Sequence, residues 1–404
     1  MSSPDLSATA TTIFRNDAEG YPFFRIPALL AINSTLLLAF AEGRGQRTDH
    51  GRVDIVLKKS ADGGSSWSPL SLVTNGMSGT IGNPAPLIDG ETITLFFCRE
   101  NREIFSTESA DFGTSWSVPK PLVGWSRPAE WEWVAAGPPA SLRTTRGRWL
   151  IPCDGLTGSK QLWKADRHFS FVLLSDDRGA SWRQGPLLDG GNECQAAELP
   201  NASLVLNMRS KEAVRFHSIS DDGGETWSAP RRATTPVRDG NCQGSMIALT
   251  GAEAPPLLLS TNVDIGRRAL TARTSVDGGE HWATLAVLEK GPSGYSALAD
   301  VGAGWAGCLY ETKRKRPAGE AATLKRASNA NGEEDVIAFV RFNTELDAAN
   351  VPATPAVAPA AAKPKAPARR STAMNWEERE RRRARLAEAV KAWQAGEEGE
   401  KGEL

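Results

Sequence analysis

The sequence has almost no net charge, because 47 Lys and Arg residues stand against 48 Asp and Glu residues in a chain of 404. A chain with this balance has no global attraction to nucleic acid or to an anionic membrane. Long hydrophobic runs are missing too: the longest, 27–40, is interrupted by Asn33, Ser34 and Thr35 and is too short to span a bilayer. The partner of this chain must therefore be sought at a local site.

Cysteine and histidine are scarce and scattered. The five Cys residues are odd in number and the four His residues form no ligand set, so neither type shows the spacing of a metal site. The sequence also lacks a Gly-rich phosphate loop and a basic stripe interleaved with aromatic residues. We therefore expect no metal, no cofactor and no nucleic-acid partner.

The first residues, MSSPDLSATATTIF, have no basic start followed by an apolar segment, and so do not resemble a secretory signal. Widely spaced cysteines in strand-like contexts are typical of reduced thiols. These features predict a cytoplasmic protein. The C-terminal sequence KGEL is similar to an ER-retention address, but we treat the match as chance because no entry signal accompanies it.

Tyrosine is rare, with three residues, whereas there are 13 Trp and 38 Gly residues. This composition favours many turns that each carry a packed indole, and hence an all-β chain. A repeated segment supports it, because the pattern Ser-x-Asp-x-Gly-x-x-Trp occurs five times, at intervals of 49, 66, 45 and 55 residues. The repeats are Ser60–Trp67, Ser109–Trp116, Ser175–Trp182, Ser220–Trp227 and Ser275–Trp282.

The spacing of the repeats is typical of the four-stranded blades of a β-propeller. In each repeat, Ser and Asp can accept bonds from the amides of their own turn, Gly supplies a positive φ, and Trp buries a large face against a hairpin. We expect five such hairpins and assign their aspartates to structure. Residues 335–342 are expected to return and complete the ring, and 312–334 to form an exposed insertion.

The composition changes after residue 347. Fifteen of the 21 residues in 348–368 are Ala or Pro, which predicts a linker over 348–373. In 374–404, the segment Asn375 to Glu378 is similar to a capping box at the start of a helix. In such a helix Leu386, Val390 and Trp393 share one face. We expect a charged C-terminal tail with one amphipathic helix. Residues 1–347 are then the propeller domain.

Several motifs lie outside the repeats, in order over roughly residues 13–345. They are Phe24–Pro27 (FRIP), Ala41–Arg44 (AEGR), Asn83–Pro84, Glu193–Leu199 (ECQAAEL), Leu206–Arg209 (LNMR), Asn241–Gly244 (NCQG), Gly291–Leu298 (GPSGYSAL) and Gly307–Glu311 (GCLYE). These motifs resemble those of the exo-α-sialidases (neuraminidases), in particular the mammalian-type lysosomal and cytosolic enzymes. The resemblance implies a six-bladed β-propeller.

The resemblance also implies a cluster of three arginines that binds the substrate carboxylate. By their motifs these are Arg25, Arg209 and Arg267. Arg268 is the alternative to Arg267, since the two residues are neighbours. A sialic acid carries a carboxylate on its anomeric carbon, which explains why fixed guanidinium groups are needed.

Tyr295 is implied as the nucleophile and Glu193 as the base that takes its proton. A carboxylate nucleophile would be repelled by the substrate carboxylate, and sialidases use Tyr instead. The separation of 16 residues from Glu193 to Arg209 suits two strands of one hairpin. Asp49 is implied as the acid/base, and the competing Asp54 fits a structural role because it lies in an alternating strand pattern.

Supporting roles follow from the same resemblance. Glu311 would hold Arg25 in place, Arg44 and Asn83 would line the pocket, and Glu130 would contact the glycerol side chain, with Glu132 as its alternative. Where cytosolic relatives place tyrosines after a strand ending in Pro, this chain has Pro152–Gly155 (PCDG). The sequence therefore does not give the preferred sialic acid.

The leading hypothesis is a retaining exo-α-sialidase that acts on sialylated glycoproteins, oligosaccharides or gangliosides through a sialyl-tyrosine intermediate. A preference for deaminated sialic acid, or transfer to another sugar, would use the same residues. A catalytically silent propeller that binds glycans or proteins is the alternative class. A lysosomal location is the alternative to the cytoplasm, and the sequence does not give the oligomeric state or linkage preference.

Overall fold

The computed structural model describes residues 4–76, 79–159, 164–249, 257–316 and 333–344. Contacts divide the chain into two units, Met1–Pro352 and Ala353–Leu404, and every described residue lies in the first. The predicted linker and C-terminal helix lie outside the described residues, so the boundary after residue 347 stays a prediction. The part that is described contains no α-helix, and only the short 3-10 helix η1 (Ser7–Thr9) precedes the strands.

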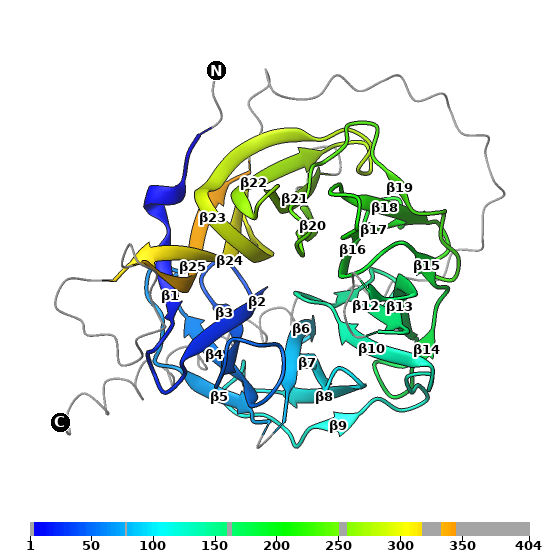
Figure 1. Ribbon diagram of the computed structural model, residues 1–404, viewed down its shortest axis with the longest axis horizontal. Coiled ribbons are helices and arrows are strands. Elements are labelled where there is room, and N and C mark those ends of the chain that lie inside the picture. The colour runs from blue at the N-terminus through cyan, green and yellow to red at the C-terminus, as the bar shows by residue number, and fades with distance from the viewer. Residues whose placement is uncertain (1–3, 77–78, 160–163, 250–256, 317–332, 345–404) are drawn as a thin grey trace, which may run out of the picture. The chain divides into compact units, whose positions relative to one another are not determined.

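The first unit is all-β, and its sheets surround a central axis in a propeller-like arrangement, as predicted (Figure 1). Three of the sheets have four antiparallel strands that follow each other in chain order. They are β2 (Phe23–Ala31), β3 (Leu37–Arg44), β4 (Val53–Ser60) and β5 (Ser71–Thr74); β6 (Ile81–Asp89), β7 (Thr92–Arg99), β8 (Glu103–Ser109) and β9 (Lys120–Pro121); and β16 (Cys194–Glu198), β17 (Leu204–Met208), β18 (Phe216–Ser220) and β19 (Arg231–Arg232).

A fourth sheet has six strands, four in one path and two short ones that pair with the two central strands of that path. Its members are β10 (Trp131–Ala136), β11 (Leu142–Arg143), β12 (Trp149–Thr157), β13 (Arg167–Ser175), β14 (Arg183–Gln184) and β15 (Leu188–Asp189). The central pair, β12 and β13, is antiparallel over nine residue pairs without a bulge.

The last sheet has seven strands in the order β1-β25-β24-β23-β22-β21-β20. They are β1 (Thr11–Arg15), β20 (Ser245–Leu249), β21 (Leu257–Asp264), β22 (Arg268–Ser275), β23 (Ala283–Gly302), β24 (Trp305–Lys315) and β25 (Glu333–Asn343). The N-terminal strand β1 pairs antiparallel with β25, so 335–342 return to the start of the chain as predicted. The prediction that 312–334 form an exposed insertion is wrong at its ends, because β24 extends to Lys315 and Glu334 is fully buried.

The five repeated segments form the same turn, each between the third and fourth strand of a sheet or, for the last, between β22 and β23. In Ser60–Trp67, the Ser60 hydroxyl donates to Asp62 at 2.8 Å and accepts from the Gly64 amide at 2.8 Å. Asp62 also accepts from the Ser66 amide at 2.9 Å. The other four repeats show the corresponding three bonds at 2.8–3.0 Å, so the aspartates are structural.

The tryptophans of the repeats explain part of the high Trp content, because several pack against a Phe of the neighbouring sheet. Trp116 meets Phe40 with 6.0 Å between ring centroids, and Trp182 meets Phe96 with 5.2 Å, both nearly edge to face. Edge-to-face pairs of this kind add to the burial energy of the rings. Trp67 of the first sheet meets Phe339 of β25 in the same way, at 5.3 Å.

Candidate active site

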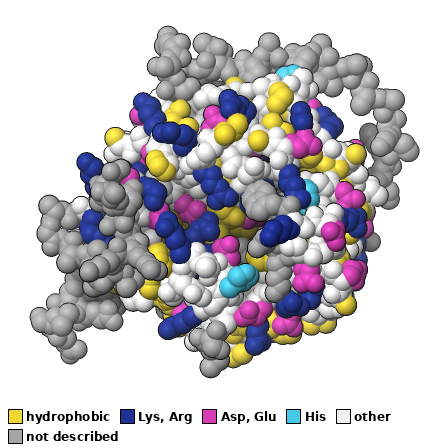
Figure 2. All heavy atoms as spheres, in the orientation of Figure 1, with side chains coloured by type: hydrophobic (Ala, Val, Ile, Leu, Met, Phe, Trp, Pro, Cys, Tyr) yellow, Lys and Arg dark blue, Asp and Glu magenta, His cyan; other side chains and the backbone are white. Residues whose placement is uncertain are grey.

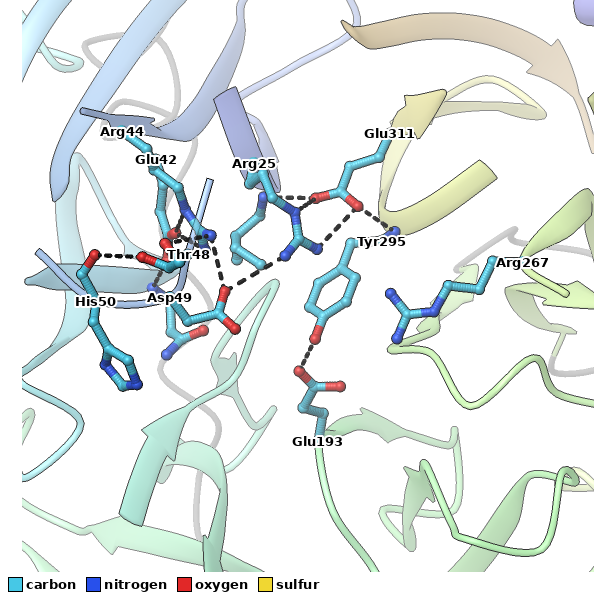
Figure 3. A network of polar contacts seen from close by, with 12 residues as sticks. Arg25, Glu42, Arg44, Thr48, Asp49, His50, Glu193, Arg267, Tyr295 and Glu311 are labelled. Atoms are coloured by element: carbon cyan, nitrogen blue, oxygen red, sulfur yellow. Dashed lines mark hydrogen bonds and ion pairs between the residues drawn. The ribbon is translucent and has the colours of Figure 1, made fainter. Parts of the chain in front are cut away.

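Arg25 is fixed by a carboxylate from the far end of the chain. In β2, its Nε and Nη2 donate to the two carboxylate oxygens of Glu311 on β24 at 3.1 and 3.2 Å (Figure 3). Ile26 has a φ of 52°, and its amide donates to the same carboxylate at 3.0 Å. Burial is the largest influence and would lower the pKa of Arg25, but the charge and hydrogen bonds of Glu311, with contributions from Tyr295 and Asp49, together raise it. The pair therefore holds a permanently charged guanidinium in one orientation.

Tyr295, Glu193 and Arg209 form a second buried group. The Tyr295 hydroxyl donates to one oxygen of Glu193, and Arg209 donates to the other oxygen at 2.8 Å. Glu193 and Arg209 lie opposite each other, because the Arg209 amide donates to the Glu193 carbonyl where β16 and β17 pair. Burial, followed by the charge of Glu193, raises the pKa of Tyr295 well above its ordinary value. The hydroxyl is therefore neutral. A neutral phenol can react as a nucleophile only if a base takes its proton, and Glu193 is the carboxylate in contact with it.

Two more guanidinium groups face the Tyr295 ring. The Arg25 carbon Cζ lies 5.1 Å from the ring centroid and that of Arg267 lies 6.0 Å away. Arg267, with a φ of 51°, is held by the Asn241 carbonyl at 2.8 Å. Arg268 is exposed and pairs with Pro292 on β23. Of the two neighbours, Arg267 is the one that the structure brings to Tyr295.

Asp49 lies on the opposite side of Arg25, on the loop between β3 and β4 (Figure 3). It accepts from Arg44 at 2.8 Å and from Arg25 at 3.5 Å, while 58% of its side chain stays exposed. Partial burial opposes ionisation, but the charges of Arg44 and then Arg25 outweigh it and lower the pKa of Asp49. Asp54, the competing candidate, is fully buried and bonds to Tyr21 at 2.9 Å, which is a structural role.

The family-model comparison agrees with this fold. A model described as a BNR repeat-like domain matches residues 35–308. The chain belongs to this family of BNR repeat-like domains. Among the curated BNR-type relatives, an exo-alpha-sialidase of Aspergillus fumigatus is 27% identical over 77% of this chain and 82% of its own length. Sialidase-2 of Mus musculus is 29% identical over 74% and 91%.

The predicted resemblance to the exo-α-sialidases, a class of glycoside hydrolases, is confirmed by these relatives. The chain spans 62% of a Bacteroides fragilis sialidase that is 24% identical to it. Solved structures similar to this BNR domain include the Hadza microbial sialidase Hz136, with a TM-score of 0.66, 24% identity, and coverage of 74% of this chain and 66% of that one. The intramolecular trans-sialidase from Ruminococcus gnavus has a TM-score of 0.62 at 17% identity, over 83% and 98% of the two chains.

Sequence reasoning missed one charged residue of the BNR domain site. Glu42 on β3 is 3% exposed, bonds to Arg44 Nε at 2.7 Å and accepts from the Asn83 amide at 2.7 Å. Burial raises its pKa, against the opposing charge of Arg44. A Glu two residues from Arg in an otherwise apolar strand is the signal that would have found it. Glu42 therefore holds Arg44, which contacts Asp49, and the same carboxylate also holds the backbone amide of Asn83.

Glu130 is not part of the described network of this BNR domain. It is exposed in the turn before β10, and within the described part of the chain no hydrogen bond or ion pair joins it to the residues above. Glu132, its alternative, lies half-buried in β10 and is likewise outside the network. The prediction that one of them contacts substrate stays untested.

A cavity of about 380 Å³ opens beside Arg25. Its lining includes Arg25, Arg267, Glu311, Ser293 and Gly294. Lys and Arg side chains gather around the centre of this face, with acidic side chains between them (Figure 2).

No helix in the described ranges is long and apolar enough to cross a membrane.

Proposed function

We propose that the protein is a retaining exo-α-sialidase that hydrolyses terminal α-ketosidic sialic acids through a covalent sialyl-tyrosine intermediate. The substrates proposed are sialylated glycoproteins, oligosaccharides or glycolipids. The observation that carries the proposal is the contact between the Tyr295 hydroxyl and the Glu193 carboxylate. A propeller that only binds glycans has no need of a buried phenol bonded to a base.

Recognition of the substrate carboxylate rests on Arg25, Arg209 and Arg267. All three lie around Tyr295: two face its ring, and Arg209 shares Glu193 with its hydroxyl. Guanidinium groups held by Glu311, Glu193 and the Asn241 carbonyl do not have to reorganise when an anion arrives. The carboxylate on the anomeric carbon would thus place that carbon near the Tyr295 oxygen.

The first chemical step moves one proton and exchanges one bond. Glu193 takes the Tyr295 proton while the phenolate oxygen bonds to the anomeric carbon and the glycosidic C–O bond breaks. Asp49 gives its proton to the leaving oxygen. In the second step Asp49 takes a proton from water, the water oxygen replaces Tyr295 on the anomeric carbon, and Glu193 returns the proton to the phenolate.

Asp49 needs its proton for the first step, although Arg44 and Arg25 lower its pKa in the free protein. Bound substrate would raise the pKa of Asp49 again, because the negative charge of the substrate carboxylate offsets the positive charge of Arg25. Substrate binding is therefore expected to favour the acid form of Asp49. The loop position and 58% exposure allow a proton to reach it from solvent.

We propose six blades for the propeller. The seven-stranded sheet supplies two of them, since β23 pairs with β22 through Pro292 and with β24 from Ser293 onward. The last blade then combines β24 and β25 with the N-terminal β1, which closes the ring. Residues 1–347 are proposed as the catalytic domain, 348–373 as the linker and 374–404 as the tail, and the cytoplasmic location stays a prediction.

The test is release of a fluorophore from an α-ketoside of N-acetylneuraminic acid by native protein, Tyr295→Phe and Tyr21→Phe. Tyr21 is the matched control, because its hydroxyl bonds to the structural Asp54. We expect kcat to fall by about three orders of magnitude or more in Tyr295→Phe and to stay within about threefold in the control. A 3-fluorosialyl fluoride should add one sialyl mass to the peptide carrying Tyr295, and NMR should show the α-anomer as first product.

Native protein that is inert on this substrate, but active on the deaminated sialoside, would change the substrate and keep the mechanism. With lactose added to the assay as an acceptor, formation of sialylated lactose rather than free sialic acid would indicate transfer. Silence on both substrates, with saturable binding of sialyllactose, would refute the enzyme and favour the silent binding propeller.

A further inference from the structure

Asp154 is a buried acid that the reaction scheme above does not use. It lies in β12 with 1% of its surface exposed. Among the described residues, its Oδ2 accepts one hydrogen bond, from the side-chain amide of Asn192 at 2.8 Å, and its Oδ1 has no hydrogen-bond partner. A buried carboxylate with one bond is costly, because an ion needs several donors or a counter-charge to replace water.

Asn192 is the residue immediately before the proposed base. Its carbonyl accepts from the Ser170 hydroxyl at 2.5 Å, and its side chain is held by Asp154. The next residue, Glu193, is tied on its other side by the Arg209 amide at 2.9 Å. Asp154 therefore fixes one side of the short segment that carries Glu193 into the site.

The surroundings of Asp154 decide its charge. The charged groups that act on it are Glu193, which disfavours ionisation, and Arg209, which favours it; the other titratable neighbours are the buried thiols of Cys98, Cys153 and Cys194. Burial is the largest influence, and with Glu193 it raises the pKa of Asp154 well above its ordinary range. An ionised Asp154 would set a second negative charge near the Glu193 carboxylate, and the two charges would repel each other.

We propose that Asp154 is a positioning residue that works in its neutral acid form, holding Glu193 in place through Asn192 without adding charge beside it. This inference rests on the proposed function where it concerns catalysis. Its protonation state is a property of the fold and is testable without any activity.

The first experiment compares kcat and KM for Asp154→Asn and Asp154→Ala. Asn is neutral and keeps an oxygen for the Asn192 amide, so kcat near pH 6 should stay within about threefold of native. Ala removes that acceptor and frees the segment before Glu193, so kcat should fall about tenfold or more with a smaller change in KM. An equal fall in kcat in both variants, or a rise in KM with unchanged kcat, would overturn the positioning role.

The second experiment measures the Tm of native protein and Asp154→Asn from pH 4 to 8. An acid whose pKa is raised by folding keeps its proton in the folded state, whereas the unfolded chain releases it above about pH 3.8. Rising pH therefore lowers the stability of the native protein relative to that of Asp154→Asn. The Tm of Asp154→Asn should gain on native by roughly 2–5 °C over this range.

Asp239→Asn is the matched control for the stability experiment. Asp239 is also fully buried, but it forms an ion pair with Arg215 at 2.8 Å and accepts from the Cys242 amide at 2.9 Å. Its variant should lie below native in Tm across the whole range, because Arg215 is left without its partner. An Asp154→Asn variant that behaves in the same way would show that Asp154 is ionised and refute the inference, whatever the outcome of the sialidase assays.

Discussion

Glu311→Gln is the substitution that tests most directly how the site is held together. Glu311 accepts four donors: Arg25 Nε at 3.1 Å, Arg25 Nη2 at 3.2 Å, and the amides of Ile26 and Tyr295 at 3.0 and 3.1 Å. One carboxylate thus orients both a proposed substrate-binding arginine and the backbone of the proposed nucleophile. Gln keeps the shape of the side chain but has one accepting oxygen and no charge.

The size of the effect follows from these four bonds. A hydrogen bond to a charged group contributes about 1.5–3 kcal/mol, and Gln turns its amide group, a donor, toward N–H groups that are donors themselves. A loss of about 3–4 kcal/mol corresponds to a fall in kcat/KM of roughly 10²–10³. Most of it should be a higher KM, because Arg25 binds the substrate carboxylate, with a smaller loss in kcat from the displaced Tyr295.

The assay is steady-state hydrolysis of the fluorogenic sialoside, with Tm measured on the same preparations. Glu108→Gln is the control, since Glu108 forms an exposed ion pair with Lys120 at 3.3 Å, and such pairs contribute little. Values of kcat/KM within about threefold of native for Glu311→Gln would refute the argument. A fall that accompanies a collapse in Tm would show that Glu311 serves folding alone.

Further outcomes are expected at the carboxylate pocket, the acid and the repeats. Arg267→Ala should raise KM about tenfold or more, whereas Arg268→Ala should keep a KM near native, because of these two arginines it is Arg267 that faces Tyr295. A larger rise in KM for Arg268→Ala than for Arg267→Ala would exchange the two assignments. Arg44→Gln removes a positive charge that lowers the pKa of Asp49, so the alkaline limb of kcat/KM should move to higher pH, and a limb that stays or moves down would contradict the acid role. Hydrogen bonds from Ser181 and Ser175 lower the pKa of Asp177 to about 2, so its contribution to stability is present above about pH 4 and lost as pH falls toward 2; the Tm gap between native protein and Asp177→Asn should close over that window, and a constant gap would argue against it.

The repeats could be predicted from the sequence because their bonds are local. Ser60, Asp62 and Gly64 satisfy one another within a single turn, so five copies of a short pattern are enough to specify five equal turns. Arg25, Glu193, Arg209 and Tyr295 were predicted through the resemblance of their motifs to those of the exo-α-sialidases, and the structure brings them together.

Other parts of the site depend on contacts that no local pattern contains. Glu311 meets Arg25 across 286 residues, and Glu42 meets the Asn83 amide across 41. Both contacts need a backbone with positive φ, at Ile26 and Asn83, which side chains with a Cβ rarely adopt. Such geometry is imposed by the tertiary contacts of the innermost strands, and for that reason composition and spacing could not place Glu42.

The pairing of β1 with β25 also sets the order of events when the chain is made. Thr11 pairs with Phe339 and Arg25 pairs with Glu311, so the first sheet is synthesised with its proposed substrate-binding arginine long before the carboxylate partner is made. Contacts so distant in sequence are slow to form and leave a strand edge open in the meantime. A nascent chain that ends before β25 is therefore expected to leave β1 without its partner strand and to show no sialidase activity.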